Sequence, residues 1–139
     1  MAEVFAGFIS GYAMALVCTP LLSLLLLQLR RDSALVARVL PPGASAISVS
    51  VLLHGALAMF WTGMGALLGL VLLAMRGSGG ALGSPNAPYT LFVAALFVAI
   101  GAPLVALLVP LRRVVVPGIV TAILVFGWLT PYLARWSAE

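Results

Sequence analysis

His54 is the side chain in this sequence that is best suited to chemistry. It is the only histidine among 139 residues, and an imidazole both titrates near neutral pH and binds metals. Gly55 and Ala56 follow it, and residues this small would let a flat macrocycle or a neighbouring helix approach closely. Three interpretations stay open for His54: a neutral, hydrogen-bonded side chain near the membrane surface, an axial ligand of a haem or chlorophyll, and a proton or substrate group.

The segment around His54 resembles the pigment-ligating stretch of light-harvesting antenna polypeptides. The shared features are a histidine, small residues after it, and a tryptophan, here Trp61, about two helical turns further on. The resemblance implies that His54 ligates a tetrapyrrole. It covers only about a dozen residues and does not extend to the rest of the chain, so the identity of any cofactor stays unknown.

Hydrolytic catalysis has little support in this sequence. Hydroxyl and thiol groups exist, among them Ser10, Cys18 and Thr62, but His54 is the single candidate base. A nucleophile needs a base within reach, and that base needs a group that orients it. Proton-coupled transport usually needs a carboxylate inside the membrane, and Glu3 stands at the extreme end of the first apolar run. We therefore expect no enzymatic activity.

The composition identifies the environment in which these residues work. Hydrophobic residues make up 64% of the chain and charged residues 7%, against about 45–50% and about 25% in soluble domains. This excludes a soluble enzyme, a nucleic-acid-binding domain and a disordered tail. All seven basic residues are arginines, which with three acidic residues give a net charge of +4. Most of these arginines flank apolar runs, as membrane topology determinants do. The first predicted partner is therefore a lipid bilayer.

Four apolar runs are long enough to cross that bilayer as helices, since about 20 residues span its hydrocarbon layer. The sequence thus predicts an all-α integral membrane protein, with four transmembrane helices in one small bundle over residues 1–139. The last two spans must form an antiparallel hairpin, and Pro117 suits the first turn of the fourth helix. The predicted spans are 4–29, 46–75, 88–111 and 117–136, with an interfacial segment at 32–40.

The arginines predict an orientation for the four spans. Cytoplasmic loops carry an excess of arginine and lysine, so the side with five arginines is placed in the cytoplasm and both termini outside it. The absence of lysine hints at a GC-rich prokaryotic genome, and hence at a prokaryotic inner membrane. The five cytoplasmic arginines are Arg30, Arg31, Arg38, Arg112 and Arg113, and all except Arg38 are also expected to contact lipid headgroups. The other side carries Arg76, Arg135, Glu3 and Glu139.

Two pairs of glycines predict close helix packing. Gly7 and Gly11 are separated by one helical turn in the first span, as are Gly65 and Gly69 in the second. This spacing puts both glycines of a pair on one helix face, where backbones can approach closely. The faces meet either within the chain or between chains, and the sequence leaves both alternatives open.

Prolines inside two spans predict local disturbances of the helices. Pro20 and Pro103 should each kink a helix or free a backbone carbonyl, and Thr19 is placed to satisfy part of the backbone around Pro20. Pro131 should bend the end of the fourth span. Among the aromatic residues, Tyr89, Tyr132 and Trp136 are expected at the headgroup level, whereas Phe60, Trp61, Phe126 and Trp128 are expected to face lipid or a partner.

The chain also carries a hint of internal duplication. The first and third spans share a proline inside the span and an Arg-Arg pair at the end, and the second and fourth share a tryptophan closely followed by threonine. This pattern predicts a helical hairpin repeated in parallel. The alternative is that leucine-rich membrane helices resemble one another by composition alone.

Taken together, these features favour an accessory or structural subunit of a larger membrane complex, acting through helix–helix packing. The alternatives are a small homo-oligomeric transporter or channel, and a haem- or chlorophyll-binding subunit that uses His54. The predicted partners are lipid and either other membrane subunits or copies of the same chain, and not nucleic acid.

Overall fold

A computed structural model gives the arrangement of the chain. It describes residues 1–32, 43, 45–76, 79–80, 83–107 and 112–137. The predicted interfacial segment, apart from its first residue, lies outside the described residues, as do Arg38 and Glu139. The last four residues predicted for the third span, 108–111, also lie outside them.

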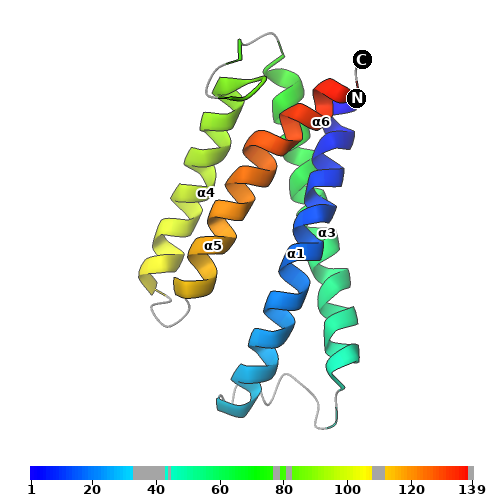
Figure 1. The fold of residues 1–139 in the computed structure, drawn as a ribbon, viewed down its shortest axis with the longest axis vertical. Helices are drawn as coiled ribbons and strands as arrows, with labels where there is room; N and C mark the ends of the chain where they lie inside the picture. Colours follow the sequence, from blue (N-terminus) through cyan, green and yellow to red (C-terminus); the bar gives the residue numbers. More distant parts are fainter. Residues whose placement is uncertain (33–42, 44, 77–78, 81–82, 108–111, 138–139) are drawn as a thin grey trace.

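The described residues form four long helices (Figure 1). Each is long and apolar enough to cross a membrane, which confirms the all-α fold and a multi-pass membrane protein. The fourth helix is continuous but changes its winding from α to π and back. The elements are α1 (Ala2–Asp32), α3 (Ala46–Ala74), α4 (Ala87–Leu107), α5 (Arg112–Ala122), the π-helix η2 (Ile123–Leu129) and α6 (Thr130–Trp136).

The start of the fourth helix differs from the prediction. It begins at Arg112, and Pro117 lies inside α5 instead of in its first turn. Proline lacks the N–H that would pair with the carbonyl of Arg113, one turn earlier. Arg113 and Pro117 are both exposed at the charged end of the helix, so water or lipid headgroups can bind that carbonyl. The helix therefore passes through Pro117 at little cost.

The start of α3 is fixed by a serine cap. Ser45 has an extended backbone, and its hydroxyl accepts a hydrogen bond from the N–H of Ser48 at 3.1 Å. This contact satisfies one of the N–H groups that a helix N-terminus leaves unpaired. The long apolar run of α3 consequently begins at a defined residue.

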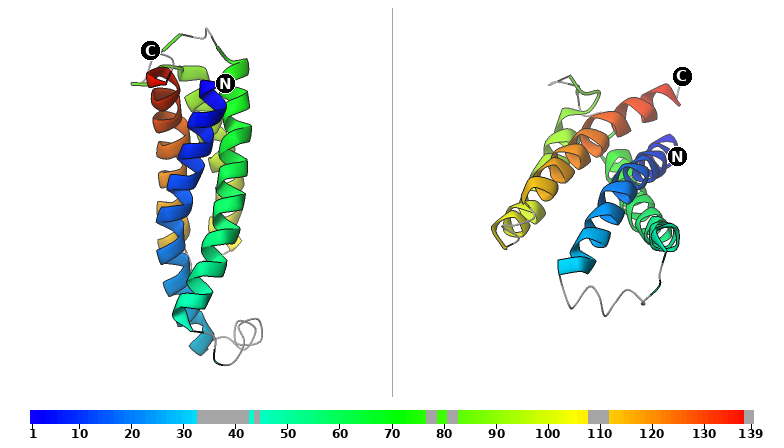
Figure 2. Two further views of the ribbon diagram at one scale, coloured as in Figure 1. Left: turned by 90° about the vertical axis from the view of Figure 1, so that its right-hand side faces the viewer. Right: turned by 60° about the horizontal axis from the view of Figure 1, so that its bottom comes forward.

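The helices form two antiparallel hairpins, α1 with α3 and α4 with α5–η2–α6 (Figure 1). The hairpins converge at the end where both chain termini lie, and there η2 and α6 pack on α1. They diverge toward the opposite end, as the right-hand view of Figure 2 shows. Arg30, Arg31, Arg112 and Arg113 belong to the divergent end.

The core lies in the convergent half of the molecule. Only 17% to 28% of the most apolar window of each helix is buried, so most of the apolar surface faces outward, as it must in lipid. The core cluster contains Ala6 and Met14 of α1, Leu68 and Leu72 of α3, Tyr89, Val93 and Phe97 of α4, and Ala122, Phe126 and Ala134 of the fourth helix.

Candidate functional site

The glycine pairs of α1 and α3 face each other inside the chain. A Cβ atom added to Gly7 would overlap the carbonyl oxygen of Gly65, and one added to Gly69 would lie 2.7 Å from the Cα of Val4. A Cβ on Gly11 would lie 2.8 Å from the Cα of Thr62. The two backbones are therefore in direct contact, and these glycine faces are not available to another subunit.

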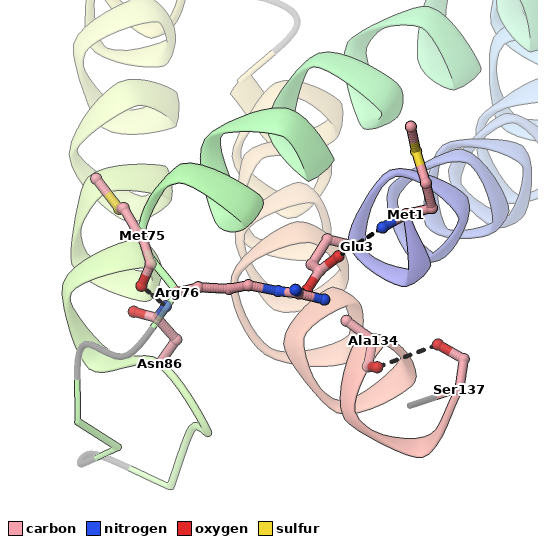
Figure 3. Close-up of polar contacts among 7 residues, drawn as sticks. All are labelled: Met1, Glu3, Met75, Arg76, Asn86, Ala134 and Ser137. Atoms are coloured by element: carbon pink, nitrogen blue, oxygen red, sulfur yellow. Dashed lines mark hydrogen bonds and ion pairs between the residues drawn. The ribbon is translucent and has the colours of Figure 1, made fainter. Parts of the chain in front are cut away.

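Polar side chains join the helices at the end with the termini (Figure 3). The carboxylate of Glu3 is buried and pairs with the guanidinium of Arg76 just after α3, and the N-terminal amine lies 3.4 Å from the same carboxylate. The side-chain amide of Asn86 donates to the carbonyl of Met75 at 2.9 Å and accepts from the N–H of Tyr89 at 3.1 Å. These contacts tie the end of α3 to the starts of α1 and α4.

The π-helix presents a backbone carbonyl to α4. The N–H of Thr130 donates to the carbonyl of Val125, which is the π pattern. One turn after Gly127 stands Pro131, which has no N–H to offer the carbonyl of Gly127. The hydroxyl of Thr90 lies 2.7 Å from that carbonyl oxygen and donates to it. A side chain of α4 thus occupies the position that the missing N–H leaves vacant.

Further buried hydroxyl groups extend this contact across the bundle. The hydroxyls of Ser84 and Thr90 are 2.7 Å apart, and those of Ser10 and Thr130 are 2.8 Å apart. The second pair connects α1 to α6. These contacts of Ser84, Asn86, Thr90 and Thr130 were not predicted from the sequence. Two signals were available: polar residues at the start of an apolar span, and a proline one turn after a glycine.

An aromatic cluster fills the contact between the two hairpins. The rings of Trp61 and Phe126 stack at a centroid distance of 5.9 Å, and those of Phe97 and Phe126 at 5.7 Å. Phe126 and Tyr89 are fully buried. The expectation that Phe126 faces lipid or a partner is therefore wrong, whereas the depth of Tyr89 in the bilayer, near the start of α4, stays a prediction. A buried ring contributes more by filling the space where four helices meet than by marking the interface.

His54 lies toward the divergent end of α3 and contacts α1. Its Nδ1 is 2.9 Å from the hydroxyl oxygen of Thr19, and that hydroxyl donates to the carbonyl of Ala15 at 2.7 Å. The ring of Tyr12 meets the imidazole edge-on at a centroid distance of 5.9 Å. His54 itself is half-buried. One ring nitrogen is thereby held by α1, while the imidazole keeps an accessible side.

A shallow depression adjoins His54 near the start of α3. It has a volume of about 430 Å³ and is lined by Ala46, Ile47, Ser50, Val51 and His54. Next along the helix, Gly55 has no atom of the described residues within 4 Å of the place where its Cβ would be. The accessible side of the imidazole thus borders an open, mostly apolar surface.

The described part of the chain contains no cluster of side chains that could hold a bare metal ion. There, no group of three or more His, Cys, Asp or Glu side chains is close enough to hold one. Structural and catalytic metal ions usually need three or four protein ligands.

The two mid-span prolines lie on exposed surfaces of α1 and α4. Both helices continue through them. Pro20 removes the N–H partner of the carbonyl of Leu16, and the hydroxyl of Thr19 binds the adjacent carbonyl, that of Ala15. Pro103 removes the N–H partner of the carbonyl of Ala99.

A comparison with other proteins adds no relative to this description. The chain matches no protein-family model, no curated protein and no solved structure.

Proposed function

We propose that this chain is an accessory subunit of a larger membrane complex, and that the outward face of α4 is where it packs against its partner. The observation that carries the proposal is a stripe of exposed alanines on α4, directly opposite the buried face of that helix. The stripe, called the alanine face below, consists of Ala95, Ala99, Ala102 and Ala106.

The first hairpin gives a reference for what small residues do in this protein. There, Gly7 and Gly65 lie where two helices touch, whereas the outward surface carries bulky residues such as Leu21 and Leu24 with only scattered small ones such as Gly63. Membrane helices generally associate through small residues, because these let backbones approach. No helix of the described residues covers the alanine face, and this small-residue surface favours a helix from another chain.

A backbone carbonyl on the same surface supports the proposal independently. Ala99 lies in the centre of the alanine face, and Pro103, also exposed, has no N–H for its carbonyl. A carbonyl without a partner is costly in hydrocarbon, because no water is present to bind it. A neighbouring helix that brings a donor, such as a serine or threonine hydroxyl, would remove this cost.

The proposal includes an orientation. The arginines at the divergent end, Arg30, Arg31, Arg112 and Arg113, would lie on the cytoplasmic side of a prokaryotic inner membrane by the positive-inside rule. Both termini would then lie outside the cytoplasm. A reporter fused after Ser137 would be active only outside the cytoplasm, and cytoplasmic activity would contradict this orientation.

Native mass spectrometry after gentle extraction from the source membrane tests the accessory role. We expect the 14.4 kDa chain to be found with larger subunits, and Ala99→Leu combined with Ala102→Leu to release it by blocking backbone contact. Ala56→Leu is the matched control, because Ala56 is also exposed but lies on α3. Masses that are whole multiples of the chain alone would contradict the proposal and favour a homo-oligomeric transporter or channel.

A further inference from the structure

A cavity lies at the end of the molecule that carries the chain termini, where the segment before α4 meets the last turns of α6. Its volume is about 400 Å³. Tyr132 joins its two walls, because the hydroxyl donates to the carbonyl of Gly83 at 2.9 Å. The walls therefore come from two segments that are far apart in the sequence. The residues that line the cavity are Gly80, Gly83, Ser84, Pro85, Tyr132 and Arg135.

The two hydroxyl groups in this lining give their protons to the protein itself. That of Tyr132 donates to the carbonyl of Gly83. The oxygen of the Ser84 hydroxyl lies 2.7 Å from that of Thr90 and 3.3 Å from the carbonyl oxygen of Asn86, so its single proton has an acceptor inside the chain. A ligand in the cavity therefore meets lone pairs at these hydroxyls and at the backbone carbonyls beside them.

Arg135 supplies the positive charge of the lining. A guanidinium has five N–H donors, so it can bind an anion alongside a partner in the protein, and phosphate oxygens suit its planar fork. The described residues of this end carry two arginines and the N-terminal amine. Their one carboxylate, that of Glu3, is paired with Arg76 and lies 3.4 Å from the amine. The charge balance here thus favours an anionic group beside Arg135.

The helix surface next to the cavity suits hydrocarbon chains. Leu129, Tyr132 and Trp136 are spaced three and four residues apart, so they share one helix face, and all three are exposed. Tyrosine and tryptophan prefer the level of the headgroups in a bilayer, and Leu129 lies one turn deeper. A molecule with a charged part in the cavity can therefore lay its chains along Leu129.

We infer that this cavity binds the headgroup of a phospholipid that carries both a phosphate and an ammonium group, as ethanolamine lipids do. The phosphate pairs with Arg135, and the ammonium donates to the carbonyl and hydroxyl oxygens of the lining. A headgroup without a cation leaves those oxygens without a donor. The site is distinct from the alanine face and does not depend on the accessory role.

Native mass spectrometry of the full chain, released from micelles, tests the inference with three separate probes. Two are phosphatidylethanolamine and phosphatidylglycerol with the same chains, and the third is phosphoethanolamine, which has the headgroup and no chains. We expect one phosphatidylethanolamine to be retained per chain, phosphatidylglycerol to be retained several-fold more weakly, and phosphoethanolamine not to be retained.

Two substitutions in the lining have matched controls elsewhere. Arg135→Gln should weaken retention about tenfold, as the loss of one charge-assisted contact does, whereas Arg76→Gln removes the same charge from the same end and should not. Tyr132→Phe releases the carbonyl of Gly83 and should weaken retention several-fold. Tyr12→Phe is its control, because Tyr12 is similarly exposed (45% against 44%) but lies on α1.

Several outcomes would overturn the inference. Equal retention of the two lipids by the parent chain would remove the ammonium from the recognition. Retention of phosphoethanolamine as strong as that of the lipid would assign the cavity to a soluble phosphate compound. Equal losses in Arg135→Gln and Arg76→Gln would show general attraction by charge, and a folded parent chain that retains none of the probes would exclude the site.

Discussion

The two hairpins close in opposite ways. In α1–α3, the glycines leave no side chain at the closest approach of the helices, and the backbones of Gly7 and Gly65 touch. In the second hairpin, Thr90 keeps its side chain and uses it as a hydrogen-bond donor to a carbonyl of the π-helix. The first contact therefore depends on glycines that have no side chain, and the second on one hydroxyl group, that of Thr90.

The difference bears on the predicted repeat. When the first and third spans are aligned at Pro20 and Pro103, Gly7 falls opposite Thr90. The position that contacts the partner helix is thus occupied by glycine in one hairpin and by threonine in the other. The antiparallel pairing is common to both hairpins, but the packing is not, and duplication stays a prediction.

The largest effect should come from adding volume to the first hairpin. Gly65→Leu places a side chain where the carbonyl of Gly7 lies, and neither backbone can yield without separating α1 from α3. We expect a loss of more than about 3 kcal/mol of stability, at the upper end of overpacking effects. Unfolding in mixed micelles with increasing sodium dodecyl sulfate, followed by tryptophan fluorescence, measures it.

Gly63→Leu is the control for that substitution. Gly63 is on the same helix but has open space around its Cβ position, so its stability should change by less than about 0.5 kcal/mol. Similar losses for the two variants would mean that leucine disturbs α3 itself and that the contact with α1 is unimportant.

A smaller effect should follow from removing the hydroxyl of the second hairpin. Thr90→Val keeps the volume but leaves the carbonyl of Gly127 without its donor, and we expect a loss of about 1–2 kcal/mol. The same micelle titration measures it, with Thr62→Val as the reference. An unchanged midpoint for Thr90→Val would show that the π-helix does not need the donor from α4.

The smallest effect should come from the ion pair that joins α1 to the end of α3. Arg76→Gln removes the charge opposite the buried carboxylate of Glu3, but the side chain of Arg76 is 59% exposed, and the N-terminal amine stays 3.4 Å from that carboxylate as a second partner. We expect a loss of less than about 1 kcal/mol that shrinks further at high salt. If Arg76→Gln lost as much stability as Gly65→Leu, the ion pair at the end of the first hairpin would contribute as much as the glycine contact.

Much of the fold could be predicted because apolar length and charge are properties of the sequence alone. Runs such as 46–75 need no partner to be identified, and α3 begins and ends within a residue of that range. The start of the fourth helix differs from the prediction because the effect of a proline on a helix depends on where the proline lies. At a wet helix end the carbonyl of Arg113 has other donors, so Pro117 does not need to begin the helix.

The contacts between helices could be predicted only in part. The glycine spacing indicated close approach, but which faces meet depends on the rotation of each helix, and that is set by the whole bundle. The contact of Thr90 with Gly127 requires a π-helix, which has no strong sequence signature. His54 stands out in the sequence as the only histidine, yet the residue that contacts its Nδ1, Thr19, belongs to another helix.

The divergence of the two hairpins has a consequence for the surrounding lipid. Because the hairpins are in contact at the end with the termini and apart at the opposite end, the described helices occupy a larger cross-section in one leaflet than in the other. Most of their apolar surface faces outward, so lipid chains meet this taper directly. The angle between the hairpins is then the coordinate on which an unequal lateral pressure of the two leaflets acts.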